Sequence, residues 1–183
     1  LPTPTPFTDA AATMAIQMIS HYLPKGCGEW KLHESSRQNG LRPVFWLVSP
    51  LTMPHWAMST RWPTSWAATT IFPHGVCNAV LLPYVMKFNL IGNMTRFKEI
   101  ALNMGVRGDN LSCSAAAEEG IAAVKRLSQR LGIPSNLKEL GVKPEDFAMM
   151  AENAMKDVCS LTNPRTATKE QIIEVFRQAY EGE

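Results

Sequence analysis

The sequence predicts an all-α fold, and three observations support that prediction. Apolar residues recur at helical spacing before residue 28 and after residue 72, and neither part alternates apolar and polar residues as strands do. Residues that favour helix N-termini precede several of these stretches, and glycines close others. The connections between them are short, which is typical of helices packed in one domain.

The first helix is expected to begin at a cap formed by Thr8 or Asp9 and to run to about Tyr22. Pro24 and Gly26 should then end it. The apolar residues of one face are Met14, Met18, Ile19 and Tyr22.

A second helical region begins after Pro73. Residues 76–88 are nearly all apolar, which predicts a helix buried on most sides and bent at Pro83. Asn93 should cap the next, shorter helix, which Gly105 closes. Its inward residues are expected to be Met94, Phe97, Ile100 and Leu102.

Three further helices are expected in the C-terminal part. Ser112 or Ser114 should cap the most regular of them, which ends at Gly132. Its apolar stripe is Ile121, Val124, Leu127 and Leu131, and its charges match the helix dipole. Pro144 should open a helix that reaches Val158, and a capping box of Thr168 and Gln171 should begin the last one.

Composition narrows the class of protein. The 183 residues suffice for one domain with a sizeable core. A net charge of +2 without a basic cluster argues against nucleic acid as the main partner, and no apolar run could span a bilayer. Four widely spaced cysteines without a CxxC pair argue against structural zinc and indicate a cytoplasmic protein with reduced thiols. The N-terminus lacks an initiator Met, so we expect a piece of a longer protein.

The most informative motif is Phe-Pro-His-Gly-Val-Cys-Asn-Ala-Val-Leu-Leu-Pro at residues 72–83. His74 lies between proline and glycine at the start of a buried helix, where a metal ligand would be held firmly. On composition alone, a histidine that only caps the helix is the commoner explanation. Asn78 either bonds the turn that carries His74 or simply caps it.

This motif closely resembles the metal-binding signature of the iron-containing (group III) alcohol dehydrogenases. Residues 5–10, 19–24, 159–165 and 168–180 resemble that family as well. The resemblance covers residues 1–26 and 73–183 and only the C-terminal half of the family's length. It therefore implies the helical, metal-binding C-terminal domain of a two-domain dehydrogenase, with the N-terminal nucleotide-binding domain absent.

The resemblance implies an oxidoreductase that oxidises primary alcohols or reduces aldehydes with NAD(P). One Fe²⁺ or Zn²⁺ is held by an Asp and three His and polarises the alcohol oxygen. His74 matches the last ligand, while the Asp and the first His would precede Leu1. The remaining ligand should lie in a His-Ala-Met-Ser/Ala-His segment, but Trp56 stands at that position and Thr60 at the second histidine. His55 is one residue away and is not given the role.

Residues 28–72 depart from the family, and all five tryptophans fall between Trp30 and Trp66. Residues 45–56 can be encoded by a DNA sequence that, read two bases later, gives Leu-Ala-Gly-Ile-Ala-Phe-Asn-Asn-Ala-Ser-Leu. This resembles the family's sequence just before its histidine segment. One permitted choice of codons for residues 66–71, also read in a shifted frame, contains Gly-Gly-Tyr-Tyr-Asp, which the family places just before Phe-Pro-His-Gly. We interpret residues 28–71 as largely out-of-frame translation, with a divergent insertion as the alternative. Four prolines in residues 41–71 predict an irregular, poorly packed stretch in either case.

Two other segments are candidates for a role. Cys159 matches a family position near the active cleft and is either a pocket-lining thiol or a small core residue. Asn163-Pro164-Arg165 either closes the substrate entrance or is a turn at a helix end.

The expected organisation is a family-like helix at 1–27, an aberrant segment at 28–72 and a helical bundle at 73–183. The isolated chain is expected to be inactive and to bind neither metal nor NAD(P) tightly. One histidine is too few ligands for a metal ion, and the cofactor domain is missing. A non-catalytic helical remnant or an interaction module is the alternative. The expected partner is a small alcohol or aldehyde. A second copy of the chain is a further candidate partner, since family members often form dimers. Nucleic acid and membranes are not expected as partners.

Overall fold

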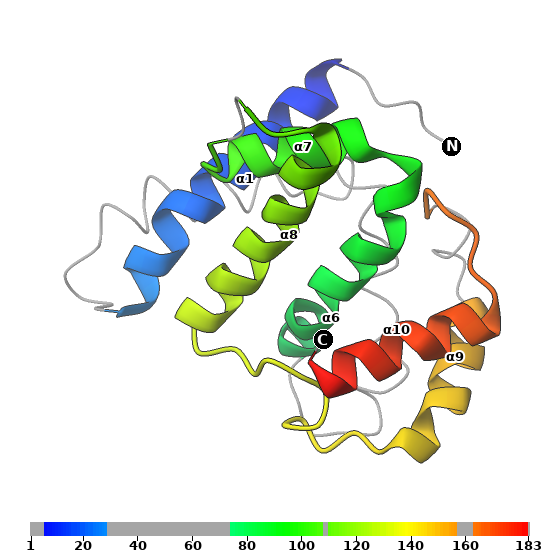
Figure 1. The fold of residues 1–183 in the computed structure, drawn as a ribbon. Coiled ribbons are helices and arrows are strands. Elements are labelled where there is room, and N and C mark those ends of the chain that lie inside the picture. Colours follow the sequence, from blue (N-terminus) through cyan, green and yellow to red (C-terminus); the bar gives the residue numbers. More distant parts are fainter. Residues whose placement is uncertain (1–5, 29–73, 108–109, 157–162, 183) are drawn as a thin grey trace. The chain divides into compact units, whose positions relative to one another are not determined.

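The computed structural model describes residues 6–28, 74–107, 110–156 and 163–182. All regular secondary structure within these ranges is helical, which confirms the all-α prediction. The described helices fall into two compact units, one with α1, α7 and α8 and the other with α6, α9 and α10 (Figure 1). Most of the stretch expected to be poorly packed, residues 29–73, lies outside the described ranges. No helix of the described chain is long and apolar enough to cross a membrane.

In the first unit, α1 spans Pro6–Gly28 and therefore does not end where the sequence predicted. Pro24 lies inside this helix, in its last turns. Asp9 does not begin the helix either: its carboxylate accepts hydrogen bonds from both terminal nitrogens of Arg96, at 2.8 and 3.1 Å. Among the side chains of this helix that the structure describes, Ala15 is the buried one, at 1 % exposure, whereas Met14 is exposed.

The helices α7, Met94–Asn103, and α8, Cys113–Arg130, pack against each other and against α1 (Figure 1). Ser112, one of the two expected caps, accepts a hydrogen bond from the Ala115 amide and begins α8. Contrary to expectation, Met94 and Leu102 are exposed, and Ala101 is the buried residue of α7. Ala101 lies against Gly120 of α8, and only small residues leave room for so close an approach.

In the second unit, α6 spans His74–Asn89 and is followed by the 3₁₀ turn η2, Leu90–Gly92. The helix is continuous through Pro83, which is buried. Pro144 does not open an α-helix directly but the 3₁₀ turn η3, Pro144–Asp146, after which α9 spans Phe147–Lys156. Val158, its expected end, lies outside the described residues.

The last helix, α10, spans Lys169–Glu181 and begins at the expected capping box. Thr168 accepts a hydrogen bond from the Gln171 amide, and the Gln171 side chain accepts one from the Thr168 amide. Apolar residues of α6, α9, α10 and the loop between residues 133 and 142 form one core. The Phe147 ring meets Tyr180 edge-on, with centroids 5.7 Å apart, and tilts against Phe176 at 6.3 Å. The shared core holds α6 against α9 and α10, and the ring contacts join α9 to α10.

Candidate functional site

The helix α6 is the candidate site because it begins with His74. Its successive turns bury Cys77, Val80, Leu81 and Tyr84, each 2 % exposed or less. A helix this deeply packed is a rigid base for the residue at its N-terminus. In the described structure, no atom lies within 4 Å of a Cβ built at Gly75, so open space adjoins the first turn.

Two titratable side chains in the middle of α6, Cys77 and Tyr84, are suited to packing rather than to chemistry. Burial raises the pKa of the Cys77 thiol above 9.0, although a backbone hydrogen bond lowers it somewhat. Burial also raises the pKa of the Tyr84 hydroxyl, which donates a hydrogen bond to the Ser135 carbonyl at 3.4 Å. Both groups therefore stay neutral near pH 7, and the Cys77 thiol is a poor metal ligand or nucleophile because the thiolate is the reactive form.

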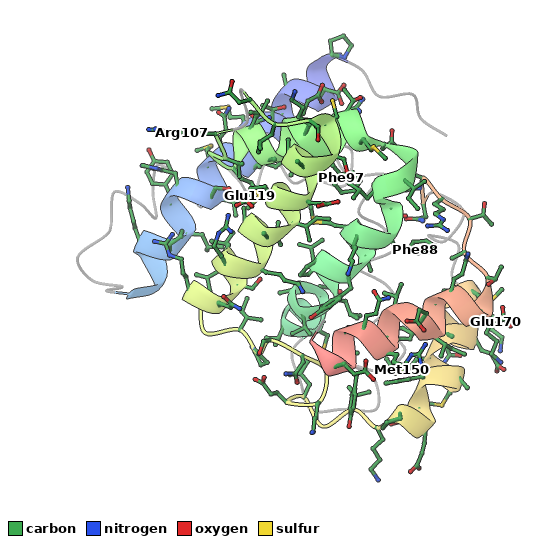
Figure 2. All side chains as sticks on the ribbon, in the orientation of Figure 1. Phe88, Phe97, Arg107, Glu119, Met150 and Glu170 are labelled. Carbon is green, nitrogen blue, oxygen red and sulfur yellow. The ribbon has the colours of Figure 1, made fainter. Side chains whose placement is uncertain are left out.

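The C-terminal end of α6 is tied to the segment before α10. Asn89, which is 4 % exposed, exchanges two hydrogen bonds of 2.9 Å with Asn163: each amide nitrogen donates to the other's carbonyl oxygen. Arg165 donates to the Phe88 carbonyl at 3.0 Å, and its guanidinium lies 4.2 Å from the centre of the Phe88 ring. Figure 2 labels Phe88 on α6. The Asn163-Pro164-Arg165 segment is thus bound to the C-terminal end of α6 by hydrogen bonds and a cation–π contact.

Sequence reasoning named Asn163 and Arg165 but missed their partners, Phe88 and Asn89. Asn89, a polar residue at the C-terminal end of a largely apolar helix, was the available signal. It did not indicate which of the distant polar residues would reach it.

Candidate metal ligands are not clustered in the part of the chain that the structure describes. Within the described ranges, no three or more His, Cys, Asp or Glu side chains are grouped so that they could hold one. Catalytic sites usually need three protein ligands and an open position. The other sequence-derived candidates, His55, Trp56, Thr60 and Cys159, lie outside the described residues.

Known proteins are similar to this chain over most of its length. Residues 53–180 match the model of the Fe-containing alcohol dehydrogenase family, C-terminal part. The match is with a family rather than with a fold alone, because it covers most of the chain.

Two curated relatives illustrate the similarity. The 1,3-propanediol dehydrogenase of Citrobacter freundii is 52 % identical over 108 residues, which are 59 % of this chain and 28 % of the relative. The NAD-dependent methanol dehydrogenase of Bacillus methanolicus is 35 % identical over 96 % of this chain and 46 % of its own length. The chain therefore spans less than half of the length of these relatives.

A solved structure agrees with the sequence matches. The crystal structure of a 1,3-propanediol oxidoreductase superposes with a TM-score of 0.86 at 37 % identity, over 98 % of this chain and 47 % of that protein. The described helices thus have counterparts in a solved crystal structure.

Proposed function

This chain belongs to the Fe-containing alcohol dehydrogenase family, in its C-terminal part, and on that premise we propose that the protein descends from NAD(P)-dependent enzymes that interconvert small primary alcohols and aldehydes. The family match over residues 53–180 is the observation that carries the proposal. The two relatives support the substrate class, since propanediol and methanol are both small primary alcohols.

Within this proposal, His74 is the residue that this chain contributes to a metal site. The first position of a buried helix supports the role, because packing of the following turns limits how far the residue can move. Fe²⁺ and Zn²⁺ both accept imidazole nitrogen as a ligand. We place Cys159 near the same cleft as a pocket-lining thiol, on the resemblance of its segment alone.

The isolated chain is proposed to be inactive. Trp56 stands where the resemblance requires a histidine ligand, and an indole N–H has no free lone pair with which to bind a metal ion. A lone imidazole leaves three positions of a tetrahedral site without a protein ligand. No catalytic step is assigned to a metal in this chain for that reason.

Two measurements on the purified 183-residue chain test this proposal. In an anaerobic assay with Fe²⁺, NAD⁺ and either methanol or 1,3-propanediol, the rate is expected to equal that of His74→Ala. Titration with Fe²⁺ or Zn²⁺ should show no stoichiometric capture. Turnover above the His74→Ala control, or one equivalent of metal held tightly, would contradict the proposed inactivity.

We also propose that residues 28–71 arise largely from out-of-frame translation. The two shifted readings at residues 45–56 and 66–71 support this, since each yields a segment that resembles the family immediately before a segment that matches it. Sequencing the genomic DNA across the locus tests the idea. Peptides from residues 41–70, detected by mass spectrometry in the natural source, would instead favour a divergent insertion.

A further inference from the structure

The first unit contains a cavity that the proposed function does not use. It has a volume of about 480 Å³ and lies between the segment after α7, the C-terminal two-thirds of α8 and Ser20 of α1. Pockets for small molecules have volumes of roughly 300–1,000 Å³. The cavity is therefore large enough for a small organic ligand.

Its wall carries an excess of positive charge. Arg107, Arg126 and Arg130 line it together with one acid, Glu119. Arg126 pairs with that acid, with 2.6 Å between Nη2 and Oε1. Arg107 and Arg130 are exposed, and neither forms an ion pair with any residue in the described ranges. Two guanidinium groups that line the cavity thus have no acid partner within the described ranges. Figure 2 labels Arg107 and Glu119.

The remainder of the wall is mainly apolar. Met104, Val106 and Leu127 line the cavity, and each is only partly buried in the described structure. These side chains offer contact area to an apolar group without a second set of hydrogen-bonding partners. The cavity is therefore lined by both cationic and apolar side chains.

We propose that this cavity binds a phosphate monoester that carries an apolar group. A guanidinium donates paired hydrogen bonds that match phosphate oxygens, and two such groups suit a dianion better than a single carboxylate. Arg130 lies in the last turn of α8, where a cation also offsets the helix dipole. Arg107 lies outside any helix and has no such second role, so it provides the more decisive test.

The test is calorimetric titration of the purified chain with phenyl phosphate. Inorganic phosphate supplies the anion alone, and benzamide supplies a neutral ring. Phenyl phosphate is expected to bind most tightly and to weaken as salt is added. Arg107→Ala and Arg130→Ala should each weaken it about tenfold, since a hydrogen bond to a charged group contributes roughly that much to affinity.

Arg177→Ala is the matched control, because Arg177 is exposed on α10 in the other unit. Its affinity for phenyl phosphate should equal that of the parent chain, and far-UV circular dichroism should show that all three variants keep their helices. The proposal is overturned if Arg107→Ala binds phenyl phosphate as tightly as the parent. It is also overturned if benzamide binds as tightly as phenyl phosphate, or if phenyl phosphate does not bind at millimolar concentration.

Discussion

Gly120 shows how a single residue decides the packing of two helices. A Cβ added there would lie 2.8 Å from Cβ of Ala101 and 3.3 Å from its Cα. Both residues are buried, Ala101 at 0 % exposure. Glycine in a helix costs stability relative to alanine, so its presence here reflects the close approach of α7 to α8 rather than helix propensity.

Gly120→Ala is therefore expected to lower the free energy of unfolding by about 1–3 kcal/mol, because the helices must move apart to admit the methyl group. Urea denaturation followed by circular dichroism measures it. Gly75→Ala is the control: nothing in the described structure would touch the added carbon, so stability should stay the same or rise. Equal destabilisation by the two changes would show that contact with Ala101 is not the cause.

At the scale of the element, α10 owes its start to the Thr168 capping box. Thr168→Ala should lower the free energy of unfolding by about 1 kcal/mol, since the Gln171 amide loses its acceptor. Thermal denaturation compares it with Thr166→Ala, an exposed threonine outside the box. If both variants melt at the same temperature, the box contributes nothing measurable.

The contact between α9 and α10 is expected to depend on pH. A hydrogen bond from the Lys169 ammonium holds the pKa of the Glu152 carboxyl below 4.5. Because the folded value is below the unfolded one, the pair stabilises the fold above about pH 4.5 and loses this effect as pH falls through the lowered pKa. The side chains of Lys169 and Glu152 are 35 % and 53 % exposed, so solvent screens the pair and the effect is small.

Glu152→Gln should accordingly melt slightly below the parent chain at neutral pH, and the difference should disappear in acid. Melting curves recorded across this range check both statements. Glu145→Gln, at an exposed acid with no ion pair to any residue of the described chain, should show no such pH-dependent difference. A gap between Glu152→Gln and the parent that persists at low pH would exclude the ion pair as its cause.

At the scale of the whole molecule, the proposed metal site would need ligands from separate segments of the chain. Trp56→His would supply the histidine that the resemblance places there, beside His74. We expect the affinity for Zn²⁺ to rise by about tenfold or more, since two imidazoles on one chain bind a common ion cooperatively. Calorimetry with Zn²⁺ measures it. Trp62→His is the control, and an equal gain there would mean that any added histidine suffices.

The sequence by itself determined the features that act over a few residues. Capping and helical spacing involve near neighbours, so the sequence could predict them. It predicted the all-α class, the caps at Ser112 and Thr168, the apolar character of α6 and the family motif at residues 72–83. The motif also identified His74 as the candidate ligand, since a dozen matching residues carry far more information than one histidine.

Only the tertiary structure decided which residues meet across elements. Asp9 pairs with Arg96 instead of capping α1, and α1 continues through Pro24. Tertiary packing also decided that Met94 and Leu102 are exposed and that Ala101 is buried against Gly120. It likewise placed both Arg107 and Arg130 in the wall of one cavity. Periodicity gives the direction of a side chain around its own helix axis. It does not give the distance or crossing of the neighbouring helix, and those decide what that side chain touches.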